Sequence, residues 1–94
     1  MTNFGREIAE AETFYRCIEI YKEIMREIEK SSDPSSNKGN WVSAYDALKK
    51  ALRLARTKEL ADQVRIFACD HKKGRKNFEG LARSAKNKVN SLKF

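Results

Sequence analysis

The spacing of apolar residues along the chain is that of a helical protein. Apolar positions recur every three or four residues in three stretches, and none shows the polar-apolar alternation of a half-buried strand. The first stretch, residues 3–30, is the most regular and predicts a long N-terminal helix of about 40 Å. Its apolar positions are Phe4, Ile8, Ala11, Phe14, Tyr15, Ile18, Tyr21, Met25 and Ile28.

A second apolar stripe lies beside the first on the same predicted helix. Cys17, Ile20 and Ile24 widen the apolar arc beyond what a two-stranded coiled coil requires. An arc of this width suits contact with two neighbouring helices. It predicts either a monomeric bundle or a homodimer formed through the first helix.

Residues 31–40 interrupt the helical pattern. The segment is rich in short polar residues and contains a proline and a glycine, all of which favour turns, so we expect a linker here. Asn40 is placed to cap a second helix. The apolar face of that helix consists of Trp41, Ala44, Tyr45, Leu48, Ala51, Leu52 and Ala55.

The apolar stripe shifts after Ala55, because its next position, Leu60, comes five residues later. This shift predicts a break between two helices. No proline or glycine enforces the break, so a single helix over residues 41–72 is the alternative. Gly74 then follows at a position suited to a left-handed helix end.

The last apolar stripe predicts a C-terminal helix that Asn77 would cap. Its buried face consists of Phe78, Leu81, Ala82, Ala85, Val89 and Leu92. Together the segments predict an all-α fold, a small antiparallel helical bundle of three or four helices. We expect it to form a single domain over residues 1–94, with residues 31–40 linking its first and second helices.

Length and composition narrow the class of protein. Ninety-four residues, 40% of them hydrophobic and 35% charged, suit one modest core. No run approaches the roughly 18 apolar residues of a membrane span, and the N-terminus lacks a secretory leader pattern, so no integral membrane association is expected. Cys17 and Cys69 are too few for a disulfide framework, which favours the cytoplasm.

The net charge of +7 is unevenly distributed along the sequence. Residues 1–30 contain seven acidic and five basic side chains, a net charge of −2, whereas residues 31–94 contain six acidic and fifteen basic ones, a net charge of +9. A segment with this excess of cations attracts polyanions such as nucleic acid or an acidic protein face.

Candidate catalytic chemistry centres on His71, the one histidine of the chain. Five residues separate Arg65 from His71, and this spacing resembles the short arginine-to-histidine motif of the HEPN superfamily of helical-bundle ribonucleases. The resemblance covers two residues and implies RNA cleavage through them. The residue after the arginine is usually polar in that family and is Ile66 here.

Other enzyme signatures are absent from the sequence. It contains no nucleophile elbow, no glycine-rich phosphate loop and no acidic cluster with metal-binding spacing. We therefore expect no metal and no cofactor. The interpretation we favour is a non-enzymatic binding module.

A basic and amide strip in the last turn and helix is the candidate binding site. Lysine and arginine neutralise phosphates, and asparagine can contact base edges or sugars, so the strip predicts association with the RNA or DNA backbone. Basic residues of the second helix, Lys49, Lys50, Arg53 and Arg56, would extend it. The residues of the strip are Lys72, Lys73, Arg75, Lys76, Arg83, Lys86, Asn87 and Asn90.

Two other interpretations of the charge remain open. The chain would be a protein–protein interaction module, such as an inhibitor, an immunity protein or an assembly subunit, if a partner protein bound the broad apolar arc of the first helix or an acidic partner bound the basic face. Alternatively, the basic residues would serve only solubility.

Overall fold

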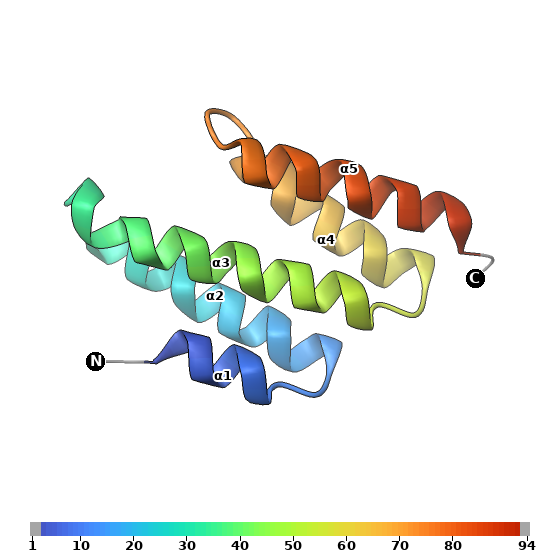
Figure 1. Cartoon of the computed structure of the whole chain (residues 1–94), viewed down its shortest axis with the longest axis horizontal. Coiled ribbons are helices and arrows are strands. Elements are labelled where there is room, and N and C mark those ends of the chain that lie inside the picture. Colours follow the sequence, from blue (N-terminus) through green and yellow to red (C-terminus); the bar gives the residue numbers. More distant parts are fainter. Residues whose placement is uncertain (1–2, 93–94) are drawn as a thin grey trace.

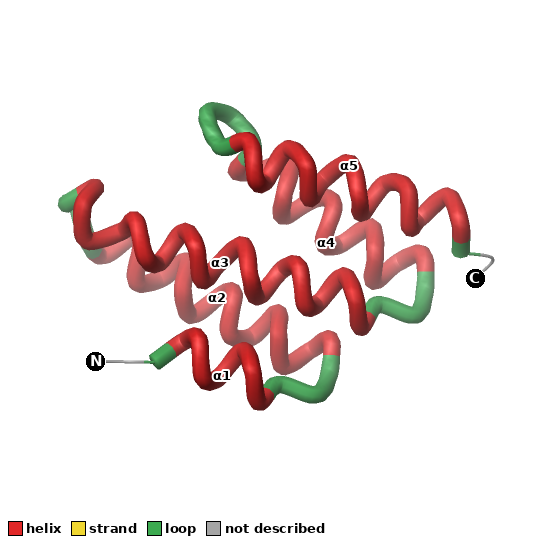
Figure 2. The backbone as a smooth tube through the Cα atoms, in the orientation of Figure 1, coloured by secondary structure: helices red, strands yellow, loops and turns green. Residues whose placement is uncertain are grey.

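The computed structural model of the chain describes residues 3–92, which form five helices and no strand (Figure 2). The all-α prediction is therefore confirmed for this part of the chain, although the predicted number of helices was three or four. The helices are α1 (Phe4–Glu10), α2 (Phe14–Lys30), α3 (Pro34–Leu54), α4 (Lys58–His71) and α5 (Lys76–Ser91).

Consecutive helices run in opposite directions and pack in a flat arrangement (Figure 1). The Cα atoms extend over 42 × 29 × 15 Å. The most extensive packing joins α2 to α3 and α4 to α5, whereas α3 meets α5 only lightly. In Figure 1, α3 and α5 lie in front of α2 and α4, so the lightly packed pair shares one face of the molecule.

The prediction of one helix over residues 3–30 was wrong, because the chain turns between α1 and α2. Ala11 is extended, and the hydroxyl of Thr13 accepts a hydrogen bond from the backbone N–H of Arg16 at 3.1 Å, which starts a new helix. The three-and-four spacing of apolar residues continues through the turn, so periodicity alone concealed it. α1 packs against α2 and α3.

The predicted linker at 31–40 is also much shorter than expected, because α3 begins at Pro34. Asp33 accepts a hydrogen bond from the backbone N–H of Ser35 at 3.0 Å, and proline is favourable in a first helical turn. The buried Asn37 amide donates to the carbonyls of Ile28 and Ser31 and so ties α3 to the end of α2. Asn40 lies inside α3 and is not its cap.

The predicted break after Ala55 is confirmed, with α3 and α4 separate helices. The hydroxyl of Thr57 accepts a hydrogen bond from the N–H of Leu60 and caps α4. Gly74 adopts the left-handed conformation predicted for it, with φ of +77°. Asn77, however, lies within α5, which begins one residue earlier, so the prediction that it caps this helix was wrong.

The core is formed by the apolar faces that periodicity identified, except that Tyr15 points away from it and is 68% exposed. It also contains the second stripe of α2, because Cys17, Ile20 and Ile24 are fully buried. The wide apolar arc predicted as a possible dimer seam is thus covered within one chain. No helix in residues 3–92 is long and apolar enough to cross a membrane.

Candidate nucleic-acid interface

A groove runs between α3 and α5 where these helices pack lightly. Its lining contains two lysines on opposite walls, Lys49 from α3 and Lys76 from α5, above an apolar floor that includes Leu52 and Leu81. We call it the α3–α5 groove, and its lining residues are Tyr45, Lys49, Leu52, Lys76, Asn77, Gly80, Leu81 and Ser84.

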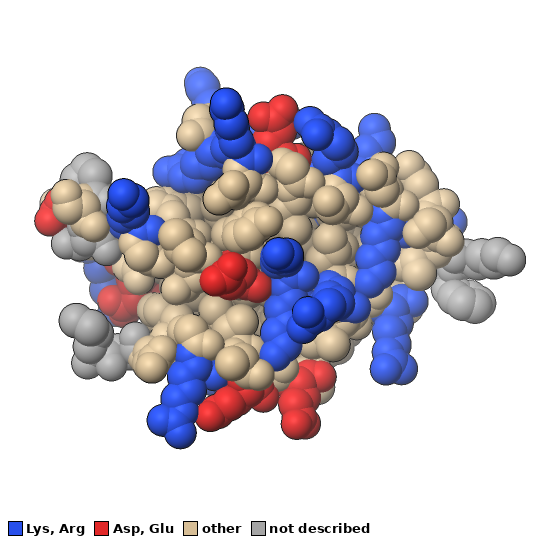
Figure 3. Space-filling view, viewed as in Figure 1, with Lys and Arg blue, Asp and Glu red and all other residues tan. Residues whose placement is uncertain are grey.

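The groove continues into a basic hollow at one end. The hollow shares Lys49 and Leu52 with the groove, and adds Lys50, Arg53 and Lys88, with Asp46 as its one acidic lining residue within the described part of the chain. In Figure 3, lysine and arginine side chains gather over α3 and along α5 on this face. The face therefore presents cations from two helices that are separate in sequence.

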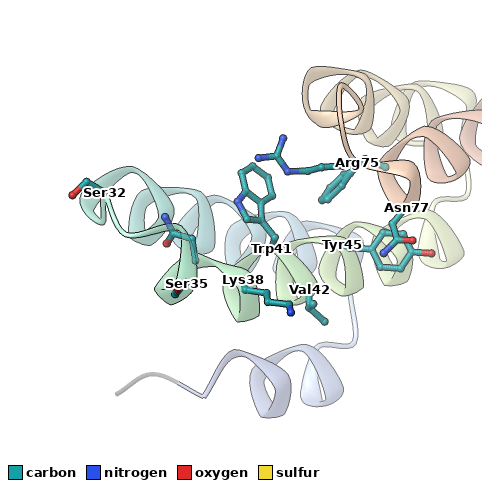
Figure 4. A pocket seen from close by; sticks show the side chains of 10 residues that line it. Ser32, Ser35, Lys38, Trp41, Val42, Tyr45, Arg75 and Asn77 are labelled. Atoms are coloured by element: carbon teal, nitrogen blue, oxygen red, sulfur yellow. The ribbon is translucent and has the colours of Figure 1, made fainter.

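At the other end, the groove opens into a cleft of about 670 Å³ between α3 and the turn before α5. Tyr45 and Asn77 line both the groove and this cleft. Figure 4 shows Trp41 projecting from α3 towards Arg75. We call this space the aromatic cleft, and its lining residues are Ser32, Ser35, Asn37, Lys38, Trp41, Val42, Tyr45, Arg75, Asn77 and Phe78.

Contacts with the buried ring of Phe78 position the aromatic walls of the cleft. Trp41 and Tyr45 each meet this ring edge to face, with centroid separations of 5.8 and 5.9 Å. The guanidinium of Arg75 lies over the Trp41 ring, 3.8 Å from its centroid, in a cation–π contact. Trp41 and Tyr45 remain half-buried, so part of each ring faces solvent.

The predicted basic strip maps to the turn and to the outer flank of α5. Seven of its eight residues are exposed, and Arg75 is half-buried against Trp41. Lys76 belongs to the α3–α5 groove and Arg75 to the aromatic cleft, whereas the other six line neither. Arg83 forms an exposed ion pair with Glu79 at 3.7 Å, which reduces the net charge at that point of the strip.

Two lysines of this face contact backbone carbonyls at helix ends. Lys50 donates to the carbonyls of Ile8 and Ala9, at 2.8 and 3.0 Å, at the end of α1. Lys88 donates to the carbonyls of Leu52 and Arg53, at 2.5 and 3.3 Å, at the end of α3. Partial burial lowers the pKa of Lys88. The side chains of Lys50 and Lys88 therefore have a structural role, which leaves Lys49, Arg53 and Lys76 as the more available cations of the groove and the basic hollow.

Arg65 and His71, the pair that resembles the ribonuclease motif, have separate partners. Arg65 forms an ion pair with Asp62 at 2.6 Å. The Nε2 atom of His71 shares a hydrogen bond with the Tyr21 hydroxyl at 2.6 Å. Residues six apart on an α-helix also lie about 120° apart around its axis. Each side chain is thus explained by contacts within the fold.

His71 lies within an aromatic cluster that joins four helices. Its ring centroid is 5.1 Å from that of Trp41 and 5.6 Å from that of Phe78, in addition to the contact with Tyr21. Burial lowers the pKa of His71, with a smaller opposing effect from Asp70. Burial also raises the pKa of Tyr21. A neutral imidazole is therefore favoured at this junction.

The sequence pattern assigned Trp41 and Tyr45 to the core and Asn77 to a helix cap, and so did not predict that all three line the aromatic cleft. It also named Lys49 and Arg53 only as an extension of the strip. One available signal was the succession of Trp41, Tyr45 and Lys49 at intervals of four, which puts two aromatic residues and a cation on one side of a helix.

Within residues 3–92, no cluster of three or more histidine, cysteine or acidic side chains is placed to hold a metal ion. The described face is instead a combination of cations, amides and aromatic rings. Comparison with protein-family models, with curated proteins and with solved structures finds no match for this chain.

Proposed function

We propose that this protein is a non-enzymatic nucleic-acid-binding module whose α3–α5 groove holds the phosphate backbone. The observation that carries the proposal is the continuity of the groove with a hollow rich in cations. Lys49 and Arg53 approach from α3 and Lys76 from α5, so the positive charge lies on both sides of one elongated depression. When a strand followed such a path, these cations would displace the counterions condensed on its phosphates.

The predicted strip on α5 fits this proposal as an outer electrostatic flank. Arg83, Lys86 and the neighbouring amides are exposed beside the groove rather than within it. Such residues would raise the local concentration of a polyanion and contact its sugars or phosphates. We assign the main binding contribution to the groove, because cations held close together on two walls act on the same stretch of backbone.

The burial of the first helix argues against one version of the protein-interaction alternative. Its version through the first helix required an exposed apolar arc, whereas Ile20 and Ile24 are fully buried. Its version through the basic face would use the same groove for an acidic protein segment. The experiment below distinguishes that ligand from nucleic acid.

The test is fluorescence anisotropy with labelled single-stranded RNA, duplex RNA and duplex DNA at about 50 and 200 mM salt. We expect binding that weakens steeply with salt. In the double variant Lys49→Ala/Lys76→Ala, the slope of log affinity against log salt should become shallower by about 1.4 for single strands, since each lost phosphate contact contributes about 0.7.

The matched control is Lys22→Ala/Arg26→Ala, which removes two exposed cations from α2 and changes the net charge equally. Its slope should stay near that of the wild type. An equal change in both double variants would show that net charge, not the groove, determines binding. Polyglutamate that bound more tightly than an oligonucleotide of equal charge would identify an acidic protein segment as the ligand and overturn the proposal.

A further inference from the structure

We infer that the aromatic cleft accepts one unpaired base of a single-stranded nucleic acid. The inference rests on the proposed function, because the base would belong to a strand whose phosphates follow the α3–α5 groove. It specifies a single-stranded nucleic acid as the ligand. Duplexes, and polyanions that have no bases, would lack this contact. Nothing in the basic strip alone distinguishes these ligands.

The first support is the continuity of the two spaces. Tyr45 lies on α3 between Trp41 and Lys49, about 6 Å along the helix axis from each. It lines both the cleft and the groove, and Asn77 does the same from α5. A strand with phosphates near Lys49 and Lys76 would therefore reach the cleft directly, without crossing another element.

The second support is the chemistry of the cleft walls. Stacking on aromatic rings and on guanidinium planes is the usual way in which proteins hold unpaired bases. The cleft contains both, in Trp41, Tyr45 and Arg75. The Arg75 guanidinium covers one face of the half-buried Trp41 ring, so a base that stacks on that face takes the place of the guanidinium. Figure 4 shows Trp41 directed towards Arg75, with Tyr45 farther along α3 beside Asn77.

The third support is that the rings are held in position before any ligand binds. Phe78, only 2% exposed, contacts Trp41 and Tyr45 edge to face, and His71 packs against Trp41 as well. Rings fixed in this way lose little conformational freedom on stacking. The Asn77 amide at the rim carries both donors and an acceptor for the edge of a base.

The cationic rim favours an anionic ligand over a neutral aromatic one. Lys38 and Arg75 line the cleft, and its lining includes no acidic side chain among the described residues. A nucleotide within a strand combines the aromatic plane and the negative charge that these walls complement. In a duplex, the same base would be paired and stacked inside the helix, out of reach of Trp41.

Trp41 is the only tryptophan in the sequence, so its fluorescence reports on the cleft directly. The probes are a single-stranded oligonucleotide of about ten nucleotides, within the usual site size for such proteins, and inorganic polyphosphate of similar charge. We expect strong quenching by the oligonucleotide. Polyphosphate should bind with a much smaller change, because it has no base to stack.

Trp41→Leu removes the aromatic face but keeps an apolar side chain. We expect its affinity for the oligonucleotide to fall about tenfold, with polyphosphate affinity unchanged. Trp41→Phe should retain most of the oligonucleotide affinity. The control Tyr15→Leu, which removes a ring from an exposed site on α2, should leave both affinities unchanged.

The outcomes separate the two proposals. If the wild-type protein bound neither probe, the proposed function would fail. If Trp41→Leu remained folded and bound both probes like the wild type, the base-stacking inference alone would be overturned. Should Trp41→Leu fail to fold, equal quenching of the wild-type protein by both probes would overturn it, and quenching confined to the oligonucleotide would support it.

Discussion

Two sides of helix α3 differ sharply, although their residues alternate along the same sequence. On one side, Ala44, Leu48 and Ala51 are fully buried in the core. On the other, Trp41, Tyr45 and Lys49 line the aromatic cleft and the groove. One side holds the fold together, whereas the other leaves rings and a cation accessible.

The difference has a physical cause in side-chain size and polarity. Alanines let a neighbouring helix approach closely, and leucine fills the space that remains, so water is excluded. A lysine cannot be buried without a partner, and Lys49 stays exposed with its ammonium 5.9 Å from the Tyr45 ring. α5 therefore meets this side of α3 only lightly, and a groove results.

The sharpest way to test this comparison is to change two adjacent residues of α3. Leu48→Ala should lower the free energy of unfolding by about 2–5 kcal/mol, because it leaves a cavity in a fully buried site. Lys49→Ala should change it by less than about 0.5 kcal/mol. Urea denaturation followed by circular dichroism measures both. Equal losses in the two variants would contradict the division of α3 into a packed and an open side.

A smaller effect is expected at Lys88, which lines the basic hollow and also supports the fold. Lys88→Met should lower the free energy of unfolding by about 1 kcal/mol, because the ammonium donates to the carbonyls of Leu52 and Arg53 at the end of α3. Burial of the charge offsets part of this contribution, as the lowered pKa of Lys88 indicates. The measurement is again urea denaturation.

Lys86→Met is the control for that variant. Lys86 is exposed on the same helix, two residues away, and its replacement should leave stability nearly unchanged. If the two methionine variants were equally stable, the contact of Lys88 with the α3 carbonyls would contribute nothing measurable.

The sequence predicted the helical class, the buried face of α5 and most of that of α3, because hydrophobic periodicity reports which residues face a core. It did not predict the turn at Ala11, where apolar spacing continues across the break and a threonine cap decides the geometry. Nor did it predict that α3 starts at Pro34, where a favourable cap and a buried asparagine outweigh the turn-forming composition of the segment.

The candidate site was predictable only in part, for a related reason. Charge in the sequence pointed correctly to an exposed strip around α5, since lysine and arginine almost always reach solvent. It could not show that Lys49 and Lys76, 27 residues apart in the sequence, line the same groove. Whether Trp41 lies inside a core or at its open edge also depends on how closely α5 approaches α3, which is a property of tertiary packing.

The smallest predicted effect concerns His71, in the aromatic cluster that joins four helices. There the half-buried His71 contacts Tyr21 of α2, with Asp70 and Arg75 as the nearby charges. Because the pKa of His71 is lowered in the folded protein, the unfolded chain takes up this proton first as pH falls below the ordinary value of 6.5. The contribution of His71 to stability should therefore be complete above pH 6.5 and decline below it.

Urea midpoints measured between about pH 8 and 5 for the wild type and for His71→Gln isolate this contribution, because the carboxylates titrate alike in both proteins. The wild type should lose more stability than the variant as pH falls through this range. The effect is the smallest of the series because the ring keeps partial access to water. If the two pH profiles were parallel, protonation of His71 would not destabilise the fold. The aromatic cluster would then tolerate a charge, as the open side of α3 does and its packed side does not.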